Sequence, residues 1–280
     1  MANHLPIEKK SLILSLLCEG QSVRAASRIA DVSPVTVLKL LLEAGEKATD
    51  LHDSLMVNIQ ANHVECDEQW QYISCKQKRV KSMEEEKERG DFWTFVALDS
   101  ETKLVPVYRV GKRTGQNTRS FMMELAVRVT TRFQLSTDSF APYADAVDRV
   151  FGDEIEYAQI HKEYAEMNGE KRYSPARIIR TTKKHIIGNP KNNRICTSYV
   201  ERQNLTTRMN CRRFTRLTNA FSKSLKHHEA AVALHFFHYN FVRIHQTLRI
   251  TPAMQAKVVN RLFDWSDLLN WGKAVQTEAA

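Results

Sequence analysis

The chain has 280 residues, 42% of them hydrophobic, and a formal net charge of +9. This length allows one large domain with a sizeable core plus a small accessory domain. The five cysteines are odd in number and form no CxxC pair, which argues against a disulfide framework and against structural zinc, so we expect a reducing compartment and no zinc. With no apolar run long enough to span a bilayer and no signal peptide, a soluble intracellular protein without membrane contact is expected.

The placement of the charge is more informative than its size. Residues 161–250 contain 18 Lys and Arg against 5 Asp and Glu, whereas the remainder of the chain is slightly acidic. A basic excess confined to one segment is typical of a surface that contacts a phosphate backbone. The segment therefore predicts nucleic-acid binding, with a solvated basic face as the alternative.

The first 45 residues predict three short helices. Apolar residues recur at helical spacing over residues 7–18, and a second helix is expected over residues 22–30. Ser33 is a suitable N-cap and Pro34 a suitable first-turn residue, so a third helix should begin there and end at Gly45.

Three helices with a tight turn before the last form the helix-turn-helix pattern, whose final helix enters the major groove of DNA. That helix would offer Ser33, Thr36 and Lys39 to the bases and phosphates. The net charge of residues 1–60 is only −1, which suits a stand-alone DNA-binding domain poorly. A small three-helix interaction or dimerisation domain is the alternative.

A sheet is predicted after a polar connection over residues 46–62. Alternation of apolar and polar residues from His63 to Tyr72 indicates the first strand, and strands follow at 92–98 and 104–110. Local connections between the three imply an antiparallel meander. The charged run at 76–89 is interpreted as an exposed loop or hairpin arm.

The meander precedes a helix at 118–132, a short strand at 133–137 and a helix at 142–151. This is the element order of an RNase H-like domain, in which helices cover both faces of a mixed sheet. We therefore predict an α/β fold in which an N-terminal helix-turn-helix precedes an RNase H-like mixed sheet flanked by helices. The expected boundaries are 1–45 for the DNA-binding domain, 46–62 for a linker, 63–262 for the RNase H-like domain and 263–280 for a C-terminal tail.

The basic part of the chain begins with a turn-rich segment. Residues 153–196 suggest a strand near 155–160 and then a turn-rich basic segment containing Tyr173-Ser174-Pro175, in which Lys183 and Lys184 are candidate DNA contacts. Residues 197–224 predict a strongly basic helix, and two further helices are expected over 228–243 and from Thr251-Pro252 onward. Arg243 and His245, at the end of one of these helices, could approach DNA or a catalytic site, although a histidine at the edge of the core is the commoner arrangement.

Three carboxylates occur at elements that could meet. Asp67 lies on the first strand, Asp138 ends the fourth, and Glu201 lies in the first turn of the basic helix. First and fourth strands are neighbours in an RNase H-like sheet, so the two aspartates should lie side by side and the helix could carry Glu201 over the strand ends. The three carboxylates would repel one another unless a pair of divalent cations neutralised their charge. Oxygen ligands favour Mg²⁺ or Mn²⁺.

Basic residues follow Glu201 closely. Arg208 comes two helical turns later on the same face, where it could hold DNA phosphate beside the metal ions. Further candidates for DNA contact in this segment are Arg212, Arg213 and Arg216.

Each acid also has a structural alternative. Asp138 could be only a helix N-cap, and Ser198-x-x-Glu201 matches a capping box that would serve backbone amides. The acidic neighbours of Asp67, Glu65 and Glu68, could be the true ligands, or this part of the strand could be only an exposed edge.

Four stretches together resemble the insertion sequence 1 family of DDE transposases over about residues 7–260. They are DEQW at 67–70, STDS at 136–139, YVERQNL at 199–205 with AFSKS at 220–224, and YNFVRIH at 239–245 before Thr251-Pro252. The resemblance implies Asp67, Asp138 and Glu201 as a metal-binding catalytic triad followed by the basic residue Arg208. It also implies a prokaryotic cytoplasmic, nucleoid-associated protein that works as a homo-oligomer on double-stranded DNA, with element ends and target DNA as its partners.

One departure concerns the N-terminus. Family members often carry a cysteine-rich zinc module ahead of the helix-turn-helix, and the sequence begins without one. End recognition is therefore expected to rest on residues 7–45 or on a separate protein. The predicted function is a transposase that binds terminal inverted repeats and catalyses metal-dependent strand cleavage and strand transfer. The alternatives are a catalytically inactive transposase-derived regulator and an RNase H-like nuclease without strand transfer.

Overall fold

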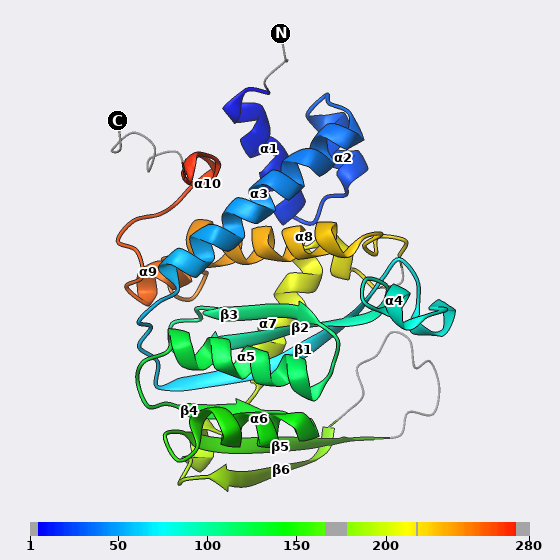
Figure 1. The fold of residues 1–280 in the computed structure, drawn as a ribbon. Coiled ribbons are helices and arrows are strands. Elements are labelled where there is room, and N and C mark those ends of the chain that lie inside the picture. Colours follow the sequence, from blue (N-terminus) through cyan, green and yellow to red (C-terminus); the bar gives the residue numbers. More distant parts are fainter. Residues whose placement is uncertain (1–4, 166–177, 217, 273–280) are drawn as a thin grey trace.

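The computed structural model describes residues 5–165, 178–216 and 218–272. A six-stranded sheet occupies one end of the molecule in Figure 1, and the N-terminal helices lie at the other. The strand order is β3-β2-β1-β4-β5-β6. The strands are β1 (His63–Ile73), β2 (Gly90–Asp99), β3 (Val107–Gly111), β4 (Gln134–Thr137), β5 (Glu156–Tyr164) and β6 (Ile178–Ile187).

The sheet is mixed, as predicted. β1, β2 and β3 pair antiparallel, which confirms the expected meander. β1 pairs parallel with β4, with Glu65 opposite Ser136, and β4 pairs parallel with β5. The prediction that the first and fourth strands are neighbours is therefore confirmed. The last pair, β5 with β6, is antiparallel.

Helices cover both faces of this sheet. Two crossover helices, α5 (Gly115–Arg128) and α6 (Ala141–Phe151), lie side by side on one face, where they connect parallel strands. The basic helix α7 (Ser198–Asn210) crosses the other face and contacts β1 and β2. A long apolar helix, α8 (Leu225–Phe237), continues as a π-helical turn, η4 (His238–Val242), in place of the regular helix predicted to Arg243.

The N-terminal region contains the three expected helices, α1 (Ile7–Cys18), α2 (Val23–Ile29) and α3 (Pro34–Leu55). Ser33 caps α3 as expected, since its Oγ accepts a hydrogen bond from the Thr36 amide at 3.1 Å. The predicted end at Gly45 is wrong, because α3 continues for ten residues and replaces most of the expected linker.

Gly45 has a packing role instead. A Cβ placed on it would lie 2.5 Å from Ala230 Cα of α8, so the missing side chain lets the two helices approach closely. Gly45 therefore marks a helix crossing inside a longer helix and not the helix end that was predicted.

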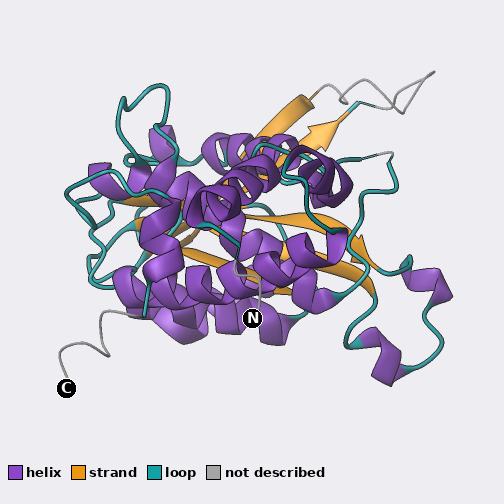
Figure 2. Cartoon of the chain, turned by 90° about the horizontal axis from the view of Figure 1, so that it is seen from above, coloured by secondary structure: helices purple, strands orange, loops and turns teal. Residues whose placement is uncertain are grey.

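Several other boundaries differ from prediction. The charged run 76–89 contains two short helices, η1 (Gln77–Arg79) and α4 (Met83–Glu86). Residues 153–196 contain the antiparallel strands β5 and β6 and a short helix, η2 (Asn192–Arg194), and Figure 2 shows strands that extend past the helices on one side. The predicted turn at Tyr173-Ser174-Pro175 lies outside the described residues.

The predicted basic helix over 197–224 ends early, at Asn210, and is followed by a short helix, η3 (Arg212–Phe214). Cys211 and Phe214 are both 5% exposed, so the chain turns toward the core where the predicted helix would have continued. After α9 (Pro252–Gln255), the expected tail contains α10 (Trp265–Asn270). Trp265 is buried, and its Nε1 donates to Ser15 Oγ of α1 at 2.6 Å.

No helix among the described residues has the length and apolar character needed to cross a membrane.

A buried histidine gives the fold a testable pH dependence. His228 of α8 is fully buried, and its Nδ1 lies 2.8 Å from Ser222 Oγ. Burial, with a smaller contribution from Arg213, lowers the pKa of His228 to about 3. An unfolded histidine has a pKa of about 6.5, so between these values the unfolded chain binds more protons and the unfolding free energy falls as pH falls.

We therefore expect His228→Asn to reduce the slope of unfolding free energy against pH below 6.5, by at most about 1.4 kcal/mol per pH unit. Urea unfolding measured at several pH values checks this, with His185→Asn at an exposed position of β6 as the control. An unchanged slope in His228→Asn would contradict the prediction, whatever its effect on stability at neutral pH.

Candidate active site

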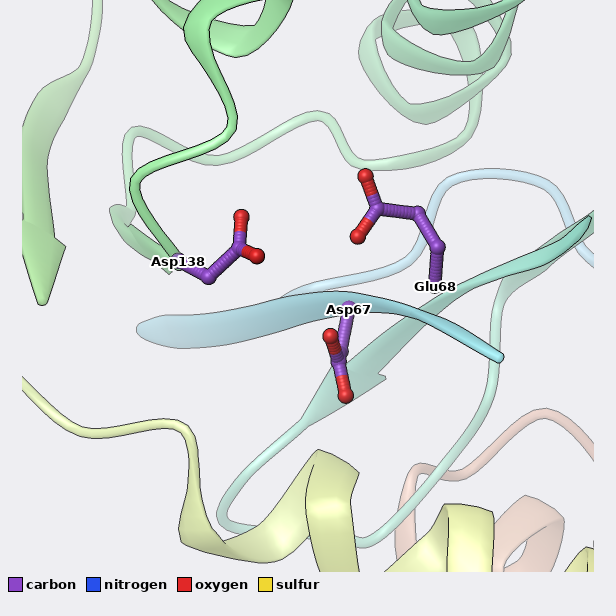
Figure 3. A group of neighbouring side chains, drawn as sticks. All are labelled: Asp67, Glu68 and Asp138. Carbon is purple, nitrogen blue, oxygen red and sulfur yellow. The ribbon is translucent and has the colours of Figure 1, made fainter. Parts of the chain in front are cut away.

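Three carboxylates converge where β4 ends beside β1. Among the described residues, one oxygen each of Asp67, Glu68 and Asp138 lies within 4.8 Å of the others (Figure 3). The register explains this meeting. Glu65 pairs with Ser136 in the parallel ladder, and β4 ends at Thr137, so Asp138 is released at the level of Asp67. The expected meeting of Asp67 and Asp138 is thus present in the structure.

Asp67 and Glu68 point to opposite faces of β1, as alternation along a strand requires (Figure 3). Asp67 points toward α7, where its Oδ2 accepts a hydrogen bond from Asn204 Nδ2 at 2.7 Å. Glu68 points the other way, and its Oε1 lies 3.5 Å from Arg113 Nε. Arg113 Nη2 is also 3.6 Å from Asp138 Oδ2, so one guanidinium serves two carboxylates of the cluster.

The acids are poorly solvated and repel one another. Burial, followed by the charge of Asp138, raises the pKa of Asp67 to about 7. The same two causes raise the pKa of Glu68 to about 8, although Arg113 opposes them. Glu68 Oε1 is buried and accepts no hydrogen bond from the described residues. A cluster of hard oxygen donors with this excess of negative charge has the chemistry that a divalent cation requires.

Glu201 lies on the same cavity as the aspartates. This cavity has a volume of about 750 Å³, and its lining includes Asp67, Asp138, Glu201 and Arg208. Glu68 is not in its lining. The three carboxylates predicted from the sequence therefore face one space, together with the predicted basic residue two turns after Glu201.

Glu201 nevertheless does not join the aspartates directly. Its Oε1 accepts a hydrogen bond from Thr197 Oγ1 at 2.6 Å and forms an ion pair with Lys162 of β5. Lys162 Nζ also donates to Thr197 Oγ1 at 3.0 Å. Among the described residues, the carboxylates whose oxygens lie within 4.8 Å of one another belong to Asp67, Glu68 and Asp138. Glu201 is instead paired with Lys162 at the side of the cavity.

The capping-box alternative for Glu201 is wrong. The N-cap of α7 is Thr197, and no side chain at that position accepts from the helix amides. Glu65 of β1 supplies the acceptor instead, because its Oε2 receives hydrogen bonds from the Tyr199 and Val200 amides at 2.8 and 3.0 Å. Glu65, which was considered as an alternative metal ligand, therefore binds the start of the helix that carries Glu201.

The N-cap alternative for Asp138 holds only in part. Its Oδ1 accepts from the Phe140 amide at 2.9 Å in the turn before α6, while its Oδ2 faces Arg113. The N-cap position of α6 itself is Phe140. Asp138 thus shapes a local turn and keeps one oxygen for the cluster.

The predicted arginines occupy different surroundings. Arg208 is half-buried, and burial followed by the nearby Arg216 lowers its pKa, whereas Asp67 acts in the opposite direction. Arg216 is exposed and Arg212 half-exposed. Arg213 is turned inward and donates to Ser222 Oγ at 3.3 Å, so it also holds the segment after α7 in place.

Other sequence candidates lie outside the cavity. Lys183 and Lys184 are exposed on β6, where Lys183 Nζ donates to the Asn192 carbonyl at 2.6 Å. Lys39 is exposed on α3, whereas the Ser33 and Thr36 hydroxyl groups lie 2.9 Å apart at the helix start. The last two candidates, exposed Arg243 and half-buried His245, follow η4 and do not line the cavity.

Sequence reasoning missed three residues of the site: Arg113, Lys162 and Asn204. Asn204 lies three residues after Glu201, so one helical turn places both toward the cavity, and this spacing was a usable signal. The two cations come from a loop before α5 and from β5, and only the strand order brings them to the acids.

No protein-family model and no curated protein matches the chain. Among solved structures, the chain is similar to complexes of Mos1 transposase. The paired-end complex with the left transposon end is 11% identical, with coverage of 56% of this chain and 60% of that chain and a TM-score of 0.23. The Mos1 strand transfer complex is 12% identical, with coverage of 56% and 59% and a TM-score of 0.24. The chain thus spans about three fifths of these proteins, and likeness at this level does not establish a family.

Proposed function

We propose that the chain is a DDE-type DNA transposase with an RNase H-like catalytic domain, related to the insertion sequence 1 family. The observation that carries this proposal is the single cavity lined by Asp67, Asp138 and Glu201 with Arg208 beside them. Carboxylates from two adjacent parallel strands and from a later helix supply oxygen ligands, and an arginine at their side suits an anionic substrate.

In this proposal Asp67 and Asp138 bind one divalent ion together, and Glu201 completes a second site. The ions, Mg²⁺ or Mn²⁺, would activate water for strand cleavage and then a DNA 3′ hydroxyl for joining, while stabilising the leaving oxygen at the phosphodiester. Asn204 orients the Asp67 carboxylate through its 2.7 Å hydrogen bond. Arg208 would hold the DNA phosphate. Glu201 would have to break its ion pair with Lys162 before it could bind the metal ion.

The remaining parts of the chain have roles in the same proposal. Helices α1 to α3 would bind the terminal inverted repeats as a helix-turn-helix, with exposed Lys39 on the recognition helix. The exposed lysines of β6 and the arginines after α7 would contact the DNA backbone, and the protein would act as a homo-oligomer on paired ends.

A specific observation supports a second candidate, a DNA-binding regulator without catalysis. Arg113 and Lys162 already supply positive charge to Asp138 and Glu201 respectively. In a regulator, these cations would be permanent substitutes for metal.

A strand-transfer assay separates the candidates. Purified protein with Mg²⁺ or Mn²⁺ is incubated with a labelled duplex from the DNA that flanks the gene, beside Asp138→Asn. Metal-dependent joined products that disappear in the variant support the transposase. Cleavage without joining supports a nuclease, and binding without cleavage in either metal supports the regulator.

The arginines after α7 give a separate prediction for binding. Arg212→Ala together with Arg216→Ala should weaken duplex binding and lower the slope of log K against log salt by about 1 to 2, because each phosphate contact releases about 0.9 counterion. Titrations at several salt concentrations in EDTA measure this slope. Arg249→Ala, an exposed arginine far along the chain from this segment, is the control. An unchanged slope in the double variant would remove this segment from the DNA interface.

A further inference from the structure

A row of aromatic side chains extends from β1 beyond the acids, with Trp70 exposed and Tyr72 and Phe221 half-buried. Trp70 and Tyr72 follow Glu68 on the same face of the strand, and their ring centroids are 5.9 Å apart. Tyr72 lies 4.6 Å from the ring of Phe221, in the segment that follows η3. We call Trp70, Tyr72 and Phe221 the aromatic row. Trp70 is 44% exposed although it is on a strand inside the sheet order, so its ring is accessible to a ligand.

The row begins beside the acid cluster. Trp70 is two residues beyond Glu68 on the same face of β1, about 7 Å along an extended strand, whereas Asp67 points to the other face. In the described ladders, β4 pairs with β1 only as far as Glu65, and the next partner on that edge is Ser222, which bridges to Ile73. Among the described strands, none pairs with this edge of β1 between Glu65 and Ile73.

The surroundings of the row favour a polyanion. Lys223 is exposed, and its Nζ lies 3.1 Å from the centroid of the Phe221 ring. Exposed Arg216 belongs to the same segment and lies close enough to Arg208 to affect its pKa. Aromatic rings with cations beside them, aligned along a strand, form the arrangement on which proteins stack unpaired bases while cations contact the phosphates.

We propose that the aromatic row is a stacking surface for unpaired bases of the DNA strand that leaves the candidate active site. This inference rests on the proposed function for the identity of the nucleic acid, and it adds a subsite for single-stranded DNA. Bases stacked inside a duplex present no free face to the rings, so the row distinguishes an unpaired strand from the interior of a duplex.

The test measures binding of the full chain in EDTA, so that it does not depend on cleavage. The probes are a blunt duplex and the same duplex extended by a short oligothymidine overhang. We expect Trp70→Ala to weaken binding of the overhang duplex by about 10-fold, the effect of losing one stacked base, and to leave the blunt duplex unchanged. The matched control is Met123→Ala, which removes an exposed apolar side chain from α5.

Trp70→Phe provides a second measurement that does not require loss of binding. It should keep most of the affinity, because phenylalanine also stacks, and it should abolish the quenching of tryptophan fluorescence by the overhang. An equal loss for both probes, or no loss for either, in Trp70→Ala would overturn the proposal. So would a Trp70→Ala protein that changes from dimer to monomer, since the row would then be an interface between copies of the chain.

The two proposals can fail separately. If the overhang binds through Trp70 but no metal-dependent cleavage occurs, the stacking surface stands and the transposase assignment does not. If cleavage occurs and Trp70→Ala binds the overhang normally, the stacking surface is wrong and the catalytic proposal is unaffected.

Discussion

Asp67→Asn should abolish metal-dependent DNA cleavage, with a loss of about 10³-fold or more, while the protein stays folded. The expected loss corresponds to the several kcal/mol of transition-state stabilisation that a bound divalent ion supplies. In EDTA the same variant should gain about 1 kcal/mol of unfolding free energy, because burial and the charge of Asp138 disfavour the Asp67 carboxylate. Asn204 can still donate to the remaining oxygen at residue 67. Cleavage rates and urea unfolding measure the two effects.

Glu68→Gln is the matched control, because Glu68 is the adjacent acid of the same cluster but does not line the cavity. We expect a loss of cleavage of about 10-fold, the size of an indirect effect on ligand orientation. A larger loss in Glu68→Gln than in Asp67→Asn would show that Glu68 is the ligand and that the Asp67 assignment is wrong. Stabilisation of the wild-type protein by Mn²⁺ that persists in Asp67→Asn would lead to the same conclusion.

The sheet could be predicted because its strands are marked by patterns between residues that are close together in the sequence. Alternation along β1 and the order of meander, helix, strand and helix were sufficient to predict Asp67 beside Asp138. Helix ends were predicted less well where tertiary packing decides them. Gly45 ended the predicted helix, yet α3 continues through it and passes close to Ala230 of α8, a neighbour far along the chain that local sequence does not reveal. The basic helix was predicted too long, since its charges continue past the point where Cys211 and Phe214 turn into the core.

The partners of the acids were less predictable than the acids themselves. Lys162 meets Glu201 only because β5 is parallel to β4 and extends beyond it. A lysine on a strand carries no local sign of such a partner. The acids beside Asp67 were considered as metal ligands or as part of an exposed strand edge, whereas the face of β1 that packs on α7 is covered. Gln69 is buried there, and its Nε2 donates to the Asn204 carbonyl at 3.0 Å.

Glu65 has the most unexpected position of these polar residues, and its removal should have a large effect on stability. Its carboxylate is fully buried and accepts from two amides in the first turn of α7. Glu65→Ala would leave the Tyr199 and Val200 amides without their acceptor, so we expect a loss of about 2 to 3 kcal/mol of unfolding free energy. Cleavage should fall by about 10- to 100-fold, because Glu201 is carried by the same first turn.

Glu65→Gln tests whether the hydrogen bonds, and not the bulk of the side chain, produce these effects. Both amides donate to Oε2, and Oε1 accepts no hydrogen bond from the described residues. The glutamine oxygen can therefore take the place of Oε2, and the glutamine NH₂ group can take the place of Oε1. Glutamine should therefore retain most of the stability and cleavage that alanine loses. Hydrogen exchange adds a local measurement, since the Tyr199 and Val200 amides should lose protection in Glu65→Ala before the rest of α7 does. If these amides stay protected in the alanine variant and cleavage is normal, Glu65 does not position the helix that presents Glu201.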